Sequence, residues 1–139
     1  MLSRRLSGAV GIGTFMLMAA STAVAQGGLA PYQGAWLSGS SDCAEVYTPA
    51  QKGTAFKKAV DIFAPAFIVS GSRLRTPQAS CRIQSVRPSG DRQLLVLDCV
   101  NAVSGNEVRV LMAPQPDGTL RRYMNARDTV GTAYRQCLR

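Results

Sequence analysis

Four cysteines constrain the fold of this chain more than any other feature of its sequence. Cys43, Cys81, Cys99 and Cys137 are the complete set, and they are spread over most of the 139 residues. An even number of cysteines in an exported chain indicates disulfides, which help a small domain to stay folded. A zinc site is the alternative, but the sequence contains no histidine and no Cys-x-x-Cys pair. We therefore expect two disulfides, no metal and no other cofactor.

The first 25 residues indicate that the chain is exported. Two arginines stand in the opening "MLSRR", an apolar run follows over 9–20, and the small residues "AVA" occupy 23–25. These three parts are typical of a signal peptide, so we expect a periplasmic or secreted protein. After Gln26 no apolar stretch approaches the length of about 20 residues that a membrane-spanning helix needs. We expect a signal peptide over 1–25, a flexible leader over 26–33 and a single β domain over 34–139.

The pattern of the mature chain predicts a mainly β fold. Short apolar or alternating runs are separated by turn sequences such as "RPSGD", "NAVSGN" and "QPDG". We expect one strand near Trp36 and a short piece over 43–47, followed by strands over 66–74, 80–86, 92–100, 107–114, 119–124 and 133–139. This series indicates a small antiparallel barrel or sandwich. Residues 49–60 fit either one short helix, capped from Thr48, or a strand.

The hairpin over 80–100 bears on the disulfide pairing. Pro88 and Gly90 fit a three-residue turn in which Cys81 faces Leu97, and a register looser by two residues sets Cys81 opposite Cys99. In either register both cysteines share one face of the hairpin. This favours Cys81–Cys99 with Cys43–Cys137, and the sequential pairing of Cys43 with Cys81 and Cys99 with Cys137 remains open.

The composition excludes several kinds of catalytic site. Without histidine the chain cannot form a Ser-His-Asp or Cys-His system, and neither a Gly-x-Ser-x-Gly elbow nor a phosphate-binding glycine motif occurs. Paired carboxylates remain as the route to a hydrolase. We expect no enzyme activity. We expect Trp36 to lie in the core.

Arginine dominates the basic residues and is the best candidate for contact with a partner. The formal charge is +8, and 14 basic residues face 8 acidic ones once residues 1–25 are removed. The candidate contact residues are Arg73, Arg75, Arg82, Arg87, Arg92, Arg121 and Arg122. They predict a surface for an anionic envelope component or a protein partner. Nucleic acid is not expected, because residues 73–92 contain no aromatic side chain. We expect a monomer.

The stretch "AFIVSGSRLRTP" (66–77) raises a problem of direction. In one regular strand Arg73 and Arg75 would share the face of Phe67 and Val69, which belongs in the core. We therefore expect a bulge or bend at Gly71 that turns both arginines outward.

Two resemblances accompany these patterns. "GAW" at 34–36 resembles the Gly-x-Trp that begins the first strand of lipocalin-type barrels and of small periplasmic protease inhibitors, whose cysteine pattern differs from this one. Trp36, the four cysteines, "SCRI", "LDC", "DGTL" and "YRQC" resemble small exported four-cysteine domains of proteobacteria with uncharacterised function. That second resemblance implies a compartment and disulfides, and no activity.

We expect an exported, non-catalytic envelope protein that binds an anionic envelope component or a protein. The two alternatives are a periplasmic inhibitor of a hydrolase and a hydrolase that uses paired carboxylates. Salt-sensitive binding through the arginines would distinguish the binding protein from the carboxylate-dependent hydrolase.

Overall fold

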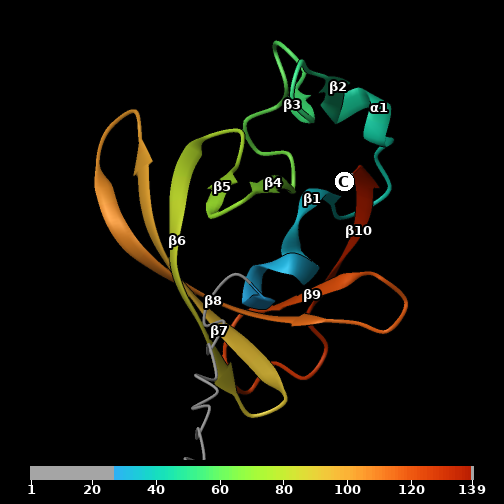
Figure 1. Cartoon of the computed structure of the whole chain (residues 1–139). Helices are drawn as coiled ribbons and strands as arrows, with labels where there is room; N and C mark the ends of the chain where they lie inside the picture. The colour runs from blue at the N-terminus through green and yellow to red at the C-terminus, as the bar shows by residue number, and fades with distance from the viewer. Residues whose placement is uncertain (1–26, 139) are drawn as a thin grey trace, which may run out of the picture.

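The structure is a computed structural model, and it describes residues 27–138. Eight antiparallel strands form a closed barrel in the order β1-β10-β9-β8-β7-β6-β5-β4, and a separate two-stranded sheet, β2-β3, stands outside it (Figure 1). The elements are η1 (Gly27–Tyr32), β1 (Gly34–Leu37), α1 (Cys43–Val46), β2 (Tyr47–Pro49), β3 (Thr54–Phe56), β4 (Ala66–Ser70), β5 (Arg73–Arg75), β6 (Ala79–Ser89), β7 (Arg92–Asn101), β8 (Gly105–Pro114), β9 (Leu120–Tyr123) and β10 (Thr132–Leu138). The predicted mainly β class is confirmed, and of the two architectures the chain adopts the barrel.

The sequence from 38 to 65 leaves the barrel and returns to cover its outer wall. β1 pairs with β4 on one side and β10 on the other, which closes the barrel. All four β1 residues are buried, because Trp36 points inward while Ala35 and Leu37 pack outward against a second apolar cluster that includes Val46 and Tyr47. The Tyr47 hydroxyl donates to the backbone carbonyls of Trp36 and Phe67. Its pKa is raised, mainly by burial.

The helix considered for 49–60 does not form. The segment instead contains the β2-β3 hairpin, in which Tyr47 pairs with Phe56 and Pro49 with Thr54. The one described α-helix is shorter and earlier, at Cys43–Val46, where the sequence predicts an extended piece. The Asp42 side chain accepts the backbone N–H of Ala44 and caps that helix. The rings of Tyr47 and Phe56 stack with 5.4 Å between their centroids, and this contact stabilises the hairpin.

The predicted single strand over 66–74 is two strands joined by a tight turn. Ser70 pairs with Arg73 across Gly71 and Ser72, so β4 and β5 form a hairpin. Gly71 has a φ of 60°, a conformation that suits glycine. Val69 and Leu74 therefore face inward together, and Arg73 turns outward. The expected outward direction is correct, but its cause is a hairpin turn and not a bulge.

The long β6-β7 hairpin carries the first disulfide. Cys81 pairs directly with Cys99, and their sulfurs are bonded. The predicted three-residue turn is wrong, since Ser89 pairs with Arg92 across a two-residue turn. A register shift between Ile83 and Ser85 reconciles that turn with the Cys81–Cys99 pair. The second disulfide joins Cys43 to Cys137 and ties the outer segment to the last strand.

Within the segment predicted as a leader, Gly27–Tyr32 form a 3-10 helix that closes one end of the barrel. Tyr32 is fully buried, and the indole N–H of Trp36 donates to its carbonyl oxygen over 2.8 Å. The predicted core position of Trp36 is confirmed, since it is 2% exposed. The predicted signal peptide lies outside the described residues. No helix within 27–138 is both long and apolar enough to cross a bilayer.

Candidate ligand-binding site

The interior of the barrel contains a cavity of about 470 Å³ that opens to solvent. Its wall is built by the inward side chains of alternate strand residues, so the binary pattern of the strands produces an apolar lining. Apolar strand residues of this lining include Phe67, Leu74, Cys81, Leu95, Leu97, Cys99, Val108, Val110 and Met112. The Cys81–Cys99 disulfide forms part of the wall. A cavity of this size and polarity is typical of sites for small molecules.

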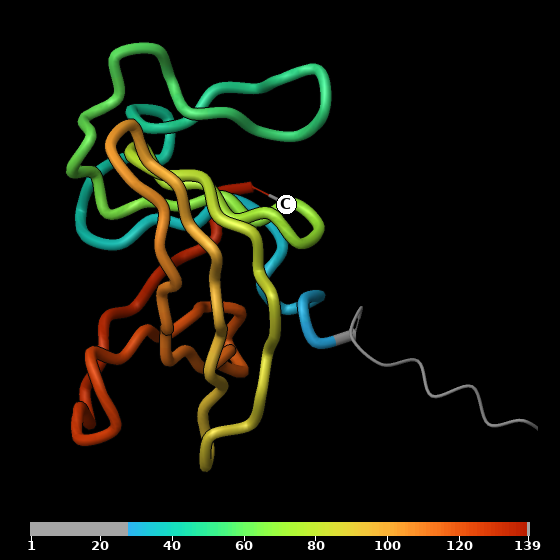
Figure 2. Tube along the Cα trace, turned by 90° about the vertical axis from the view of Figure 1, so that its left-hand side faces the viewer, coloured from blue at the N-terminus to red at the C-terminus, as the bar shows by residue number. Residues whose placement is uncertain are grey.

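The cavity is open because one strand outruns its neighbour. β8 pairs with β7 along Gly105–Met112, whereas its ladder with β9 begins only at Leu111. Residues 105–110 therefore have no strand partner on their second edge among the described residues. Asn106, Val108 and Val110 line the cavity along this unpaired half of β8. Figure 2 shows the long β7-β8 hairpin reaching the end of the molecule where the segment 57–65 also lies.

Among the described residues, one charged side chain lines the cavity, Arg122 of β9. It comes from the strand end next to the gap, where it pairs with Met112 of β8 and Thr132 of β10. The guanidinium is exposed to the opening and has no hydrogen-bond or ion-pair partner within residues 27–138. No aspartate or glutamate lines the described cavity. An apolar pocket with one unpaired cation attracts an apolar molecule that carries a negative charge.

Tyr134 of β10 contributes a second polar group to the same wall. Its ring is buried and packs against Phe67, with 5.1 Å between the ring centroids. Its hydroxyl has no hydrogen-bond partner in the described part of the chain, and no buried side-chain polar atom there is left unsatisfied. The hydroxyl is therefore accessible from the cavity, where it can donate a hydrogen bond to a ligand oxygen.

The opposite end of the barrel is closed. The Tyr32 hydroxyl donates to Oε1 of Gln93, and burial raises the pKa of Tyr32 to about 12. Gly28 comes so close to Val86 that an added Cβ would lie 3.8 Å from the valine Cβ. The 3-10 helix thus fills the space beside the part of β6 that extends past β5. The mouth of the cavity of about 470 Å³ lies at the other end, where residues 62–65 and 76–79 line it.

The seven candidate arginines do not form one surface. Arg73, Arg75 and Arg82 lie together on the outer face of β5 and β6, where Arg73 pairs directly with Arg82. Arg87 is exposed farther along β6, and Arg122 lies at the cavity. The sequence groups Arg121 with Arg122, but the strand alternation sends these neighbours to opposite faces. Arg121 donates to the carbonyl oxygen of Val130 over 2.7 Å.

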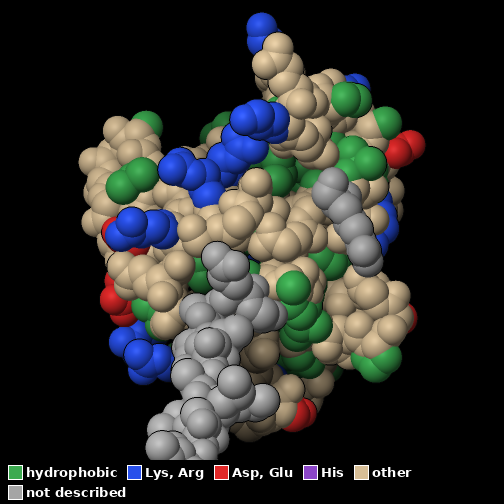
Figure 3. Space-filling view, viewed as in Figure 1, with side chains coloured by type: hydrophobic (Ala, Val, Ile, Leu, Met, Phe, Trp, Pro, Cys, Tyr) green, Lys and Arg blue, Asp and Glu red, His purple; other side chains and the backbone are tan. Residues whose placement is uncertain are grey.

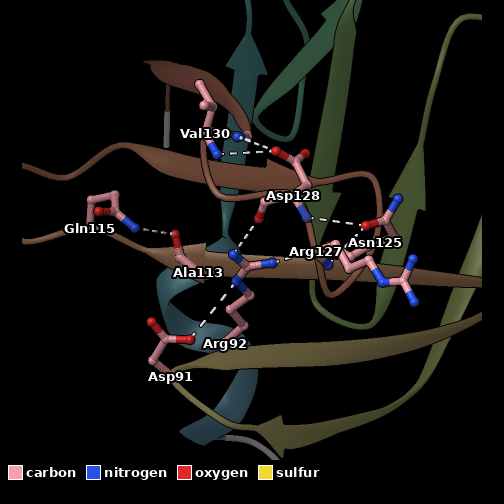
Figure 4. Close-up of polar contacts among 9 residues, drawn as sticks. Asp91, Arg92, Ala113, Gln115, Asn125, Arg127, Asp128 and Val130 are labelled. Carbon is pink, nitrogen blue, oxygen red and sulfur yellow. Dashed lines mark hydrogen bonds and ion pairs between the residues drawn. The ribbon is translucent and has the colours of Figure 1, made fainter.

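Arg92 has a structural role (Figure 4). Its guanidinium lies 3.5 Å from the centroid of the Tyr123 ring and donates to the carbonyl oxygens of Asn125 and Asp128. The Asp128 carboxylate in turn accepts the N–H groups of Met124, Val130 and Gly131, and these bonds lower its pKa. Because these contacts occupy Arg92, we leave it out of the candidate binding residues.

The described carboxylates do not gather around the cavity. Asp98 and Glu107 face each other across β7 and β8, but both are exposed on the outer wall, where Glu107 pairs with Arg109 at 3.1 Å. No group of three or more metal-ligating side chains occurs within 27–138. The hydrolase alternative needs two carboxyl groups that converge on a cleft, and the cavity offers none among these residues.

Sequence reasoning missed the cavity and the separate position of Arg122. A signal for the second was present, since Leu120 and Arg122 share one parity in a strand and Leu120 is an obvious core residue. Comparison with protein-family models, with curated proteins and with solved structures finds no match for this chain. The function proposed below therefore rests on the geometry of the chain itself.

Proposed function

We propose that this protein is a non-catalytic, exported binding protein that holds an anionic amphipathic molecule of the cell envelope. The apolar part of the ligand lies in the barrel cavity, and its acidic head meets Arg122 and the hydroxyl of Tyr134. The observation that carries the proposal is the cavity of about 470 Å³ in which, within residues 27–138, the one charged lining side chain is an arginine without a partner.

The energetics favour a ligand with an alkyl chain. Each methylene transferred from water to an apolar site contributes about 0.8 kcal/mol, so a chain of about ten contributes roughly 8 kcal/mol before the costs of immobilisation. A hydrogen bond to a charged group adds about 1.5–3 kcal/mol. Fatty acids and anionic lipids combine both features.

An exported location agrees with two further observations. The two disulfides suit an oxidising compartment such as the periplasm or the extracellular space. The sequence of residues 1–25 has the three parts of a signal peptide. In that compartment the envelope supplies anionic molecules with acyl chains.

Calorimetric titration of the mature, oxidised protein tests the proposal. Dodecanoate is the probe, and dodecanol is its uncharged counterpart with the same chain. We expect dodecanoate to bind and Arg122→Ala to weaken it by about tenfold or more, with little effect on dodecanol. Arg87→Ala, an exposed arginine on the outer wall, is the matched control.

A second variant tests the position of the chain. Val108→Trp places a larger side chain in the cavity wall at the half of β8 that lacks a second partner. We expect it to weaken both probes while thermal unfolding shows that the barrel still folds. Binding that neither Arg122→Ala nor Val108→Trp changes, or no binding of either probe, refutes the proposal.

A further inference from the structure

The mouth of the cavity is surrounded by exposed apolar side chains. Ile62 and Phe63 are 54% and 77% exposed on one segment, and Val100 and Val103 are 56% and 92% exposed on the β7-β8 hairpin. The first three line the opening itself. These four are the majority of the seven large hydrophobic side chains that are exposed within residues 27–138. We call them the apolar rim. Such a concentration marks an interaction surface.

The backbone that carries the rim is fixed by hydrogen bonds. The Gln78 side chain donates to the carbonyl oxygen of Ile62 over 2.7 Å, and the N–H of Phe63 donates to the Asp61 carboxylate over 2.9 Å. On the other side, Oδ1 of Asn101 accepts the N–H of Val103 over 2.8 Å. Polar contacts thus satisfy the backbone of these turns while their apolar side chains remain in water. A surface built in this way is ready for an apolar partner.

Positive charge lies beside the rim. Arg75 stands on the outer wall next to the turn 76–78, which joins β5 to β6 at the mouth, and Arg73 and Arg82 follow farther along the same wall. The guanidinium of Arg73 donates to Oγ of Ser80, the residue that pairs with Arg75. Figure 3 shows Lys and Arg side chains gathered over β4 and β5, viewed from the side on which η1 lies. Arg73 and Arg82 are direct cross-strand partners, so two positive charges stand side by side on this wall. We call these three arginines the basic belt.

Other charges lie near the mouth and the belt. Lys57 and Lys58 are exposed at the start of the segment that leads to Ile62. Asp61 is the acid of that segment, and its carboxylate is occupied by the N–H of Phe63. Asp98 is the direct cross-strand partner of Arg82 on the other edge of β6, and Glu107 pairs with Asp98 one strand farther.

We propose that the mouth of the barrel docks on the surface of an anionic lipid bilayer. The apolar rim enters the boundary between headgroups and acyl chains, and the basic belt contacts the anionic headgroups. Docked in this way, the opening faces the bilayer, and an amphipathic ligand passes between membrane and cavity without crossing water. This last step rests on the proposed function, whereas the docking rests on the rim and the belt.

Sedimentation with lipid vesicles tests the docking. The mature, oxidised protein is mixed with vesicles of phosphatidylcholine alone or with added phosphatidylglycerol. We expect binding to the anionic vesicles only, reduced by salt and reduced about tenfold or more in Arg73→Ala/Arg82→Ala. Phe63→Ser/Val103→Ser should weaken it to a similar extent. Met124→Ser/Val130→Ser removes two equally exposed apolar side chains away from the mouth and should bind like the wild type.

Three outcomes overturn the docking: no binding to either vesicle, wild-type binding by Phe63→Ser/Val103→Ser, or an equal loss in Met124→Ser/Val130→Ser. In the first case the rim fits a protein partner. Dodecanoate titration separates the two proposals. Val103→Ser, a rim residue outside the cavity lining, should weaken vesicle binding but keep dodecanoate binding. Vesicle binding without any dodecanoate binding would refute the proposed function and leave the docking intact.

Discussion

The two disulfides should differ in how strongly they stabilise the barrel. Cys43–Cys137 closes a loop with a sequence separation of 94, whereas Cys81–Cys99 spans 18. In the chain-entropy model a crosslink stabilises the folded state because it removes conformations from the unfolded chain, and its effect grows with the logarithm of loop length. At 25 °C that model gives about 4.7 kcal/mol for the long loop and about 3.2 kcal/mol for the short one.

Variants with a single disulfide isolate these values. Cys81→Ala/Cys99→Ala keeps the long loop, and Cys43→Ala/Cys137→Ala keeps the short one. Each variant is unfolded in urea in its oxidised and its reduced form, so both thiols remain in place and the packing of the sulfur atoms changes little. The difference in the free energy of unfolding between the two forms is the contribution of that crosslink.

We expect the long loop to contribute about 1.5 kcal/mol more than the short one. For a domain of this size that difference corresponds to roughly 6–12 °C in Tm. The short loop must also place two free thiols in a core where Cys81 and Cys99 are 5% and 8% exposed. If the short crosslink contributes as much as the long one or more, crowding of the two thiols in the reduced form outweighs loop entropy, and the reasoning is wrong.

Three further perturbations follow from the structure. Gly131→Ala should lower the free energy of unfolding in urea by more than about 2 kcal/mol, because the φ of Gly131 is 68° and an added Cβ would lie 2.8 Å from the Arg122 carbonyl oxygen. Gly118 has a φ of 84° but open space around it, so Gly118→Ala should lower that free energy by only about 1 kcal/mol. Arg92→Ala should lower the free energy of unfolding by about 1–3 kcal/mol in the same assay, since it removes the contact with the Tyr123 ring and two hydrogen bonds. A decrease no larger than that caused by substituting an exposed arginine would contradict the structural role of Arg92. Burial raises the pKa of Tyr32 to about 12 and raises that of Tyr47 as well, so folding favours their protonated forms. The contribution of these two tyrosines to the free energy of unfolding is complete below the unfolded pKa near 10 and is lost as the pH rises toward 12. An ultraviolet titration of the folded protein in which all tyrosines ionise together near pH 10 would refute this pH dependence.

The sequence by itself determined the features that depend on neighbours along the chain. Alternation in the strands assigned Ile83, Leu95 and Leu97 to the face shared by both cysteines of the hairpin, and these residues are buried together. That shared face, together with the even number of cysteines, led to the correct pairing. Trp36 was assigned to the core because a lone tryptophan beside a first strand is more often a core residue than a binding platform. In a strand the side-chain direction has a period of two, so a local pattern is sufficient.

Turns were less predictable, because small differences in turn geometry change the register. At Gly71 we expected a bulge or bend within one strand, and the structure has a hairpin turn between two strands there. The turn around Gly90 was expected to have three residues, which would set Cys81 opposite Leu97. The observed two-residue turn, together with the shift between Ile83 and Ser85, sets Cys81 opposite Cys99. The segment 49–60 had apolar residues that suit a helix or a strand, and packing of Phe56 on Tyr47 decided for the strand.

Only the tertiary structure decided the candidate site. The closure of the barrel joins β1 to β4, and its opening arises because β9 meets β8 only from Leu111 onward. Both depend on pairing between segments that are far apart in the chain, which no local pattern encodes. The same pairing separates Arg122 from Arg121 and brings Arg73 beside Arg82. The sequence therefore determined what each strand buries, and the closure of the sheet determined what the buried faces enclose.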